Sequence, residues 1–237
     1  MKVEQIFRYP LKSGAAQALS QTDVNPLGLV GDRVWILTDP QGRFVTAREC
    51  PLMGQIQVQG SRFSLGDDLS PLAELGPAQP LSIWNRTQQG RRACDEVNAW
   101  FSQVLNLEAV LWHLQVDDQQ HYGDSQPVMV LFQATAQAIE QALGRPFAAL
   151  QLRPNVVLSG GEAFSEGQLG NLILGSAELG PIEPCTRCKM INLTPESGAY
   201  DRFDVAPALR QLSPDFVAGH HFCVRTPGLV SVGDTRQ

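Results

Sequence analysis

Two cysteines three residues apart, Cys185 and Cys188, carry the most reactive side chains of this 237-residue chain. Arg187 lies between them and Lys189 follows directly, so both thiols have cationic neighbours along the sequence. Nearby positive charge favours the thiolate, which is both a nucleophile and a metal ligand. The segment therefore indicates a cysteine that acts as a nucleophile or binds a metal.

A second stretch places polar side chains at the start of a buried strand. Arg153 and Asn155 lead into the apolar run 156–158, which reads as a strand. An apolar strand does not need an arginine and an asparagine at its mouth for packing. These two residues are therefore candidates for binding a ligand.

The first fifty residues contain further candidates near predicted turns. A strand over residues 3–9 ends at a proline, and Lys12 and Ser13 follow in a polar turn. A strand over 34–38, a turn at 39–42 and a strand over 44–48 form a predicted hairpin. Arg33 precedes this hairpin, and Thr46 and Arg48 lie on its second strand. The alternative interpretation of these cations is ordinary surface charge.

Composition narrows the classes of function. A net charge of −6 argues against a general nucleic-acid-binding role. The first residues lack the basic and apolar regions of a signal peptide, and the apolar run 128–132 is too short to span a bilayer. Five scattered cysteines, an odd number, do not predict a disulfide framework. We expect a cytoplasmic protein without a membrane partner.

The rest of the chain predicts many short strands and a few helices. Glycine and proline punctuate strand-like segments over 55–83, which suggests a small barrel or sandwich. Helical spacing predicts a helix within 94–105 with Asp95 as its N-cap, and a helix over 135–143 ended by Gly144. Further expected elements are strands over 107–114, 128–132 and 172–174, a short helix over 207–212, and two strands within 222–234.

Six motifs in a fixed order carry a resemblance to a known family. They are Tyr9-Pro10-Leu11-Lys12-Ser13, Gly31-Asp32-Arg33, Thr46-Ala47-Arg48, Arg153-Pro154-Asn155, Pro184-Cys185-Thr186-Arg187-Cys188 and Gly228-Leu229-Val230-Ser231-Val232-Gly233-Asp234. The chain resembles the MOSC family, the molybdenum cofactor sulfurase C-terminal domain proteins. It is most similar to the subgroup with an N-terminal MOSC β-barrel domain, which includes the mitochondrial amidoxime-reducing components and their bacterial relatives.

The resemblance implies a fold and a domain division. We expect an α+β, mostly β architecture. An N-terminal β-barrel-like domain would cover residues 1–95, and a MOSC β-barrel with a few helices would cover residues 96–237.

The resemblance also implies a molybdenum cofactor, in which a pterin holds the metal through two dithiolene sulfurs and carries a phosphate. Cys185 would be the catalytic residue and a molybdenum ligand, since a soft thiolate suits this metal. Cofactor-binding residues would be Lys12, Ser13, Arg33, Thr46, Arg48, Ser125, Arg153, Asn155, Thr186 and Arg187, because arginine suits bidentate phosphate contact. We expect Lys12, Arg33 and Arg153 to converge with Cys185 on one pocket.

The implied activity is reduction of a small N-hydroxylated compound. No iron–sulfur ligand set or dinucleotide fingerprint occurs in the chain. We therefore expect an external electron donor, either ferredoxin-like or cytochrome-type with its reductase. The alternative is a non-catalytic carrier of the cofactor or of sulfur on Cys185. Pyridoxal phosphate is a further ligand that the resemblance allows.

Some positions depart from the family pattern. Gly14-Ala15-Ala16-Gln17 follows the Lys-Ser turn, where family members often carry a cysteine or glycine pattern, and Leu169 replaces a common tryptophan. The membrane anchor of the eukaryotic relatives and the ferredoxin domain of some bacterial ones are not expected here. These departures concern the substrate and the electron donor more than the class of cofactor.

Other interpretations of the cysteines compete with this one. A thioredoxin-like pair requires the Cys-x-x-Cys at a helix start in a βαβ unit, whereas β-type sequence surrounds it here. A zinc site would add His220 and His221, but adjacent residues of a strand point to opposite faces. Without the resemblance, an inert buried thiol would be the leading interpretation of Cys185. We interpret Cys188 as structural or as a residue that supports the metal site without binding the metal, and Cys50, Cys94 and Cys223 as small apolar residues.

Overall fold

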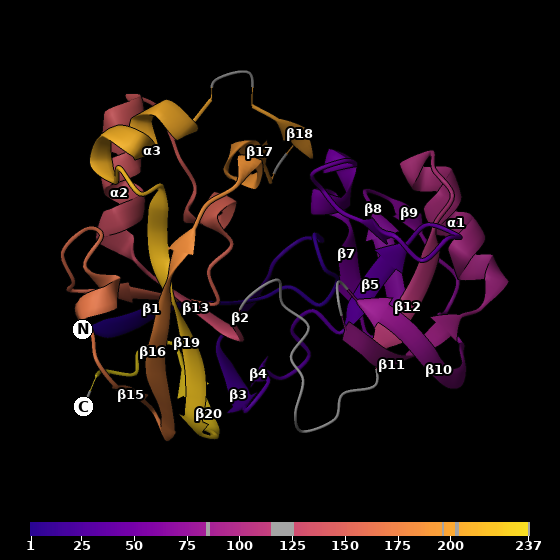
Figure 1. Ribbon diagram of the computed structural model, residues 1–237, viewed down its shortest axis with the longest axis horizontal. Helices are drawn as coiled ribbons and strands as arrows, with labels where there is room; N and C mark the ends of the chain where they lie inside the picture. Colours follow the sequence, from indigo (N-terminus) through magenta and orange to yellow (C-terminus); the bar gives the residue numbers. More distant parts are fainter. Residues whose placement is uncertain (84–85, 115–125, 196, 202–203, 237) are drawn as a thin grey trace.

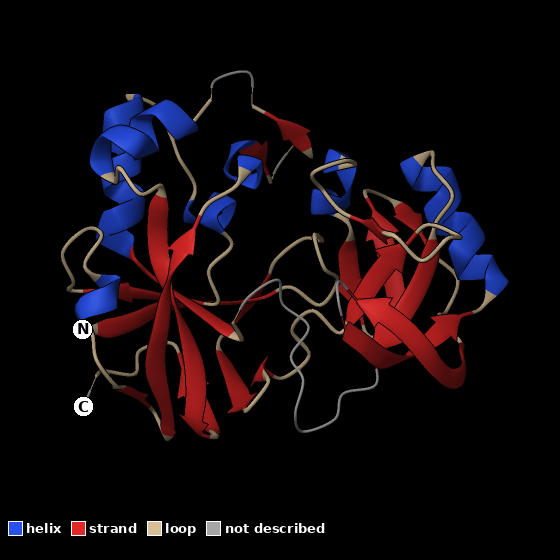
Figure 2. Ribbon diagram, viewed as in Figure 1, coloured by secondary structure: helices blue, strands red, loops and turns tan. Residues whose placement is uncertain are grey.

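The chain forms two lobes joined side by side, as a computed structural model shows (Figure 1). The structure describes all residues except 84–85, 115–125, 196, 202–203 and 237. A smaller lobe contains residues 35–114, and a larger lobe contains residues 1–29 and 126–236. Strands dominate both lobes and the helices lie at their edges (Figure 2). The prediction of a mostly β, α+β fold is confirmed.

The larger lobe is built on a seven-stranded sheet of the described residues, in the order β15-β16-β19-β13-β14-β1-β2. Its strands are β1 (Lys2–Arg8), β2 (Gln17–Leu19), β13 (Val128–Phe132), β14 (Val156–Ser159), β15 (Leu172–Leu174), β16 (Ala177–Thr186) and β19 (Val217–Thr226). The five residues of β13 are all buried, because the strand is central and covered on both faces. β13 pairs parallel with β14, and β14 pairs antiparallel with β1.

A small three-stranded sheet of the order β20-β3-β4 extends this lobe. Its strands are β3 (Gln21–Asn25), β4 (Gly28–Leu29) and β20 (Gly228–Ser231). Helices α2 (Gln133–Leu143) and α3 (Ala206–Leu212) and the short 3-10 helices η2 (Ala149–Leu152), η3 (Glu166–Gln168) and η4 (Lys189–Asn192) complete the lobe. Gly144 ends α2 in the left-handed conformation, as its sequence position predicts.

The smaller lobe is built on a curled five-stranded sheet of the order β10-β11-β12-β5-β6. Its strands are β5 (Trp35–Thr38), β6 (Phe44–Val45), β10 (Leu75–Ile83), β11 (Arg86–Ala93) and β12 (Val110–Leu114). A second sheet contains β7 (Gln57–Gln59), β8 (Arg62–Leu65) and β9 (Asp68–Leu69), and η1 (Pro51–Gln55) precedes it. The predicted strand over 44–48 is wrong at its end: the strand stops at Val45, and Thr46 accepts two backbone hydrogen bonds in a turn.

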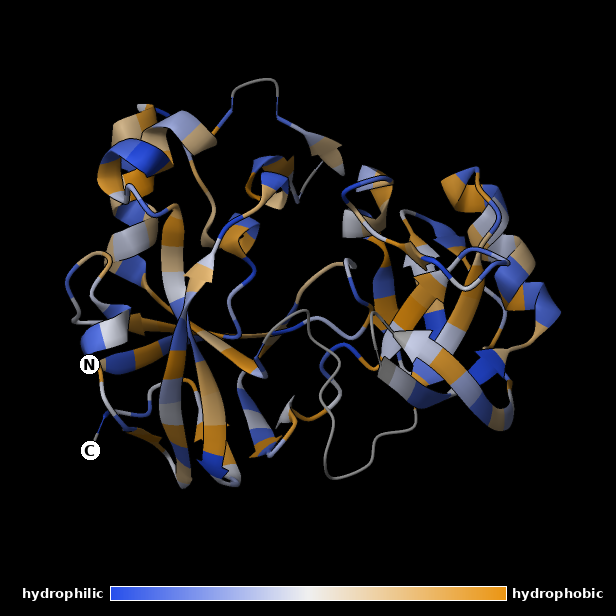
Figure 3. Cartoon of the chain, viewed as in Figure 1, coloured by the Kyte–Doolittle hydropathy of each residue, from blue (hydrophilic) through white to orange (hydrophobic). Residues whose placement is uncertain are grey.

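Helix α1 (Asp95–Leu105) packs its apolar face into the core of the smaller lobe. Trp100, Phe101 and Leu105 are buried there, as their spacing predicts. Hydrophobic and hydrophilic residues both occur along this helix (Figure 3). The predicted N-cap is wrong by one residue, since Cys94 occupies that position without a side-chain cap. Asp95 instead lies in the first turn, where a carboxylate is favourable beside the positive end of the helix dipole.

Each lobe contains segments from both sides of the predicted domain boundary. β1 lies in the sheet of the larger lobe, whereas α1 and β12 pack in the smaller lobe. Leu193, just after η4, packs into the core of the smaller lobe, and the Tyr200 hydroxyl donates to the Ala47 carbonyl at 2.9 Å. The division at residues 95 and 96 stays a prediction about domains. The segment after η4 therefore holds the two lobes against each other.

Candidate functional site

One cavity of about 740 Å³ brings together residues that are far apart in the sequence. The predicted site residues that line it are Lys12, Ser13, Arg33, Arg48, Arg153, Asn155, Cys185, Thr186 and Arg187. The expected convergence of Lys12, Arg33 and Arg153 with Cys185 is therefore present. Thr46 is buried but is not among the lining residues, and Ser125 lies outside the described residues.

Cys185 lies near the end of β16, at the point where the strand leaves the sheet. Its side chain is 5% exposed. Arg187 donates from Nη1 to the Cys185 Sγ at 2.7 Å and from Nη2 to the Leu152 carbonyl at 2.7 Å. The Nε of Arg187 is buried without a hydrogen-bond partner among the described residues. Because a buried N–H without a partner is costly, this atom points to an acceptor that a ligand would supply.

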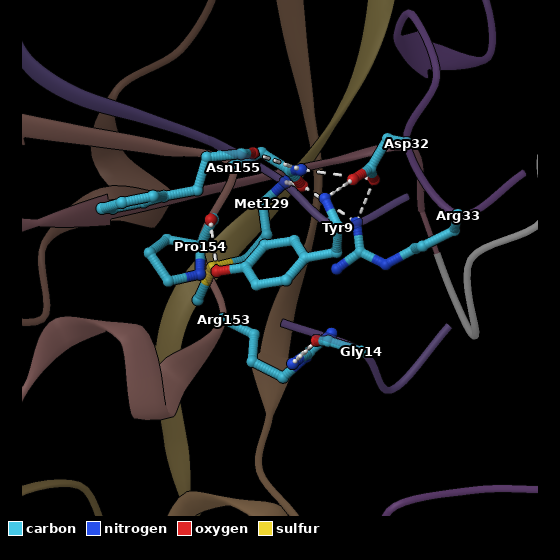
Figure 4. Close-up of polar contacts among 9 residues, drawn as sticks. Tyr9, Gly14, Asp32, Arg33, Met129, Arg153, Pro154 and Asn155 are labelled. Carbon is cyan, nitrogen blue, oxygen red and sulfur yellow. Dashed lines mark hydrogen bonds and ion pairs between the residues drawn. The ribbon is translucent and has the colours of Figure 1, made fainter. Parts of the chain in front are cut away.

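Arg153 caps η2 and reaches back to the turn after β1. Its Nη1 donates to the Gly14 carbonyl at 2.9 Å, and its guanidinium lies 4.2 Å from the ring centre of Tyr9 (Figure 4). Burial, together with Arg33 and Arg187, lowers the pKa of Arg153 to about 10, which still leaves it charged at neutral pH. Arg153 therefore brings a positive charge that water shields only weakly.

Tyr9 supports two of the cations at once. The Arg33 guanidinium also lies against the Tyr9 ring, 5.0 Å from its centre, and the Tyr9 hydroxyl donates to the Pro154 carbonyl at 3.0 Å. Tyr9 is 1% exposed, and burial raises the pKa of its phenol, so the ring stays neutral. Cations are attracted to the face of such a ring. Sequence reasoning gave Tyr9 no role, although it lies three residues before Lys12.

The polar atoms of the Asn155 side chain bind neighbouring groups of the protein and so fix the geometry around Arg33 and Asp32. Its side-chain oxygen accepts from the Met129 amide at 3.1 Å and from Arg33 Nη1 at 3.5 Å. Its side-chain nitrogen donates to the Phe7 carbonyl at 3.2 Å and to Asp32 at 3.3 Å. The amide group is therefore saturated by the protein. Its predicted role as a direct pterin ligand stays untested, and its contacts describe a positioning residue.

Asp32 is the acidic partner that sequence reasoning missed. One of its oxygens accepts from the Tyr9 amide at 2.7 Å, and the other is ion-paired with Arg33. The Asp32 side chain is 5% exposed, which strengthens this ion pair. The only sequence signal for its role is its position directly before Arg33.

Lys12 lies between three arginines and is 7% exposed. Burial first, and then Arg33, Arg48 and Arg153, lower the pKa of Lys12 to about 7. In the protein without a ligand, Lys12 is therefore uncharged in a fraction of the molecules near neutral pH. A bound anion would reverse this trend, because it compensates the repulsion among the cations.

Three residues that line the same cavity have an unusual backbone conformation. Ser13, Arg33 and Arg153 adopt left-handed φ values of 67°, 51° and 53°. They are three of only six non-glycine residues with positive φ among those the structure describes. Such conformations cost free energy and cluster at ligand-binding sites. The strain therefore supports the view that these side chains are held in place for a ligand.

Glu183 on β16, Asp215 just before β19 and His221 on β19 also line the cavity. His221 Nδ1 lies 3.7 Å from Glu183 Oε1. Burial and Arg187 lower the pKa of His221 to about 4 despite Glu183, so the imidazole is neutral at physiological pH. The lining thus carries five cationic side chains against two carboxylates, in a chain whose net charge is −6.

The competing interpretations of the cysteines find little support. Cys185 lies on an antiparallel strand and Cys188 is the N-cap residue of η4, so no βαβ unit frames the pair. Across the described ranges, no three His, Cys, Asp or Glu side chains form a cluster that could hold a metal ion. His220 and His221 neighbour each other on β19, and only His221 lines the cavity.

Comparisons with known proteins agree with this architecture. The profile of the MOSC N-terminal beta barrel domain matches residues 1–108, and the profile of the MOSC domain matches residues 117–236. The chain therefore belongs to the MOSC family. None of the described helices is long and apolar enough to span a membrane.

Named relatives cover nearly the whole chain. The mitochondrial amidoxime-reducing component 1 of Mus musculus is 26% identical over 98% of this chain and 80% of its own length. The mitochondrial amidoxime reducing component 2 of Homo sapiens is also 26% identical, over 98% of this chain and 82% of its own. The crystal structure of the YUAD protein from Bacillus subtilis superposes with a TM-score of 0.52 at 15% identity, covering 98% of this chain and 92% of that one, which shows a shared fold.

Proposed function

We propose that this chain is a molybdenum-cofactor-dependent reductase of N-hydroxylated compounds that receives its electrons from a separate redox protein. The observation that carries the proposal is the position of the buried Cys185 thiol in the same cavity as Lys12, Arg33 and Arg153. The similarity to amidoxime-reducing components, 26% identical over 98% of the chain, supports the choice of reaction.

The residues of the cavity fit a phosphorylated, sulfur-ligated metal cofactor. Lys12, Arg33 and Arg153 would hold the phosphate, since guanidinium groups bind phosphate oxygens in pairs. Cys185 would bind the molybdenum through its thiolate. The unpartnered Arg187 Nε offers a further buried donor to the pterin or to a metal-bound group. When bound, the cofactor supplies a metal centre that exchanges two electrons.

The overall reaction breaks one N–O bond. The substrate R–NH–OH takes up two electrons and two protons, and R–NH₂ and water leave. The chain's own residues position the reactants: Arg187 holds the Cys185 sulfur in place, and the neutral His221 adds no further positive charge to the cavity. The donor protein supplies the electrons. The five free cysteines suit a reducing compartment, so a cytoplasmic setting belongs to this proposal.

The test uses protein purified from a host that makes molybdopterin. We expect about one molybdenum per chain, as the single thiolate site implies, and a fluorescent pterin on denaturation. The loaded protein should reduce an amidoxime with a reduced dye and should not do so with NADH alone. Cys185→Ser should abolish this activity. Cys223→Ser is the matched control, because Cys223 is partly buried and is not among the cavity residues.

The carrier alternative predicts a different outcome. Loaded protein that is inactive on a panel of N-hydroxylated compounds with reduced dye, but transfers sulfur from Cys185, would show a carrier of cofactor or sulfur. Full reductase activity of Cys185→Ser would disprove the metal-ligand assignment.

A further inference from the structure

A second cavity, which we call the neutral chamber, lies beside the cationic cavity and shares Arg153 and Met190 with it. Its volume is about 480 Å³, within the range of small-molecule sites. Met190 lies in η4, two residues after Cys188. The neutral chamber is therefore adjacent to the cavity that Cys185 lines, with Arg153 and Met190 between the two.

The two cavities differ sharply in charge. The neutral chamber contains Arg153 as its one charged side chain among the described residues, and this guanidinium already donates to Gly14 and contacts Tyr9. The other lining side chains are apolar, small or amide-bearing, among them Ala16, Leu150 and Met190. A phosphate would gain little from this lining. An uncharged organic group would bury apolar surface there.

Small residues from both lobes line the neutral chamber and leave its volume open. Ala15 and Ala16 follow the Lys-Ser turn, and Gly54 and Gly66 face them from the smaller lobe. A Cβ on Gly54 would lie 2.9 Å from the side chain of Leu193, which also lines the chamber, so a larger residue there would require Leu193 to move. Ala15 and Ala16 belong to the stretch where this chain departs from the family pattern. Small side chains at these two positions therefore help to set the size of the chamber.

We propose that the neutral chamber binds the uncharged organic body of the substrate, so that an N-hydroxyl group at its end reaches the Cys185 cavity past Arg153 and Met190. The inference rests on the proposed reductase function. It assigns the organic body of such a substrate to this chamber, and the neutral lining favours an uncharged aryl or alkyl group there. Ala16 is then a residue that determines specificity.

The experiment compares Ala16→Phe with Ala18→Phe. Ala16 lines the chamber and packs against the cluster of Tyr9, whereas Ala18 is exposed on β2 and does not line the chamber. Gln57→Trp, at an exposed position of the rim, is a second variant that should fold if Ala16→Phe does not. Thermal unfolding verifies folding, and the molybdenum content is measured for each protein.

Two readouts separate this inference from the proposed function. The first is saturation-transfer NMR with benzamidoxime on protein lacking the cofactor, which should show transfer to the ring protons in wild type and Ala18→Phe but not in Ala16→Phe. The second is the ratio of kcat/KM for benzamidoxime to that for hydroxylamine. We expect it to fall about tenfold or more in Ala16→Phe and Gln57→Trp, since a filled pocket excludes the larger substrate.

Each contrary result has a distinct meaning. Equal saturation transfer in wild type and Ala16→Phe, or an unchanged ratio, overturns the inference. Lower molybdenum and pterin content in Ala16→Phe also overturns it, because the cofactor would then occupy the chamber. Ring binding that depends on Ala16 in a protein inactive on every N-hydroxylated compound would support the chamber as a ligand site and refute the reductase proposal.

Discussion

Replacing Tyr9 tests whether its ring holds Arg33 and Arg153 in position for an anion. Tyr9→Phe keeps the ring that both guanidinium groups contact, at 5.0 Å and 4.2 Å, but removes the hydroxyl that donates to Pro154. Tyr9→Leu removes the ring as well. The two variants therefore separate the hydrogen bond from the contact with the cations.

The structure sets the expected magnitudes. Tyr9→Phe leaves the Pro154 carbonyl without its partner, which should lower the free energy of unfolding by about 1–2 kcal/mol. Tyr9→Leu also loses cation–π contacts and leaves a cavity, for a total of about 3–4 kcal/mol. Sulfate affinity of the cofactor-free protein should fall less than about twofold in Tyr9→Phe and roughly tenfold in Tyr9→Leu, since one misplaced charged hydrogen bond suffices for that loss.

Urea unfolding measures the stability of each variant, and isothermal titration with sulfate measures anion binding. Ala18→Leu is the control, because Ala18 is exposed on β2. A purely structural Tyr9 would lower stability in both variants and leave the sulfate affinity of the folded protein unchanged. That result, or equal losses of affinity in Tyr9→Phe and Tyr9→Leu, would refute the reasoning.

Three further predictions concern the same cavity. Sulfate affinity of cofactor-free protein should fall as pH rises through about 7, because Lys12 loses its proton there. Lys12→Arg should flatten this pH profile, and a flat profile in the wild-type protein would contradict the role of Lys12. Asp32→Asn should weaken sulfate binding severalfold despite removing a negative charge, because Asp32 orients Arg33 and the Tyr9 amide; tighter binding in titration would show a merely electrostatic role. Cys188→Ser should retain most of the molybdenum and dye-driven activity that Cys185→Ser loses, and equal losses would assign both thiols to the metal.

The strands and helices with clear periodicity could be predicted from the sequence. The apolar run of β13, the face of α1 and Gly144 at the end of α2 follow directly from local pattern. The ends of strands are harder to predict where the geometry of a turn competes with the strand propensity of the residues. Thr46 and Arg48 look like strand residues, but the backbone turns after Val45 because Thr46 accepts hydrogen bonds from residues three and four positions later.

The candidate site could be predicted as a set of residues but not as an arrangement. Family motifs identified Lys12, Arg33, Arg153 and Cys185, and the structure places them around one cavity. The side chains that hold them could not be found this way, because their partners are distant in sequence. Asn155 meets Phe7 across 148 positions, a contact that exists only once β1 has paired with β14.

The concentration of positive charge links folding to ligand binding. Without an anion, Lys12, Arg33, Arg48, Arg153 and Arg187 repel one another around a partly buried cavity. Burial lowers the pKa of Lys12, and repulsion from Arg33, Arg48 and Arg153 lowers it further. Asp32 and the Tyr9 ring offset part of this repulsion, and the left-handed backbone at Ser13, Arg33 and Arg153 adds to the cost. The protein therefore bears an electrostatic cost that an anionic ligand would relieve. By linkage, such a ligand at free concentration L should raise the free energy of unfolding by RT ln(1 + L/Kd), and most strongly below about pH 7, where Lys12 is charged and the anion binds most tightly.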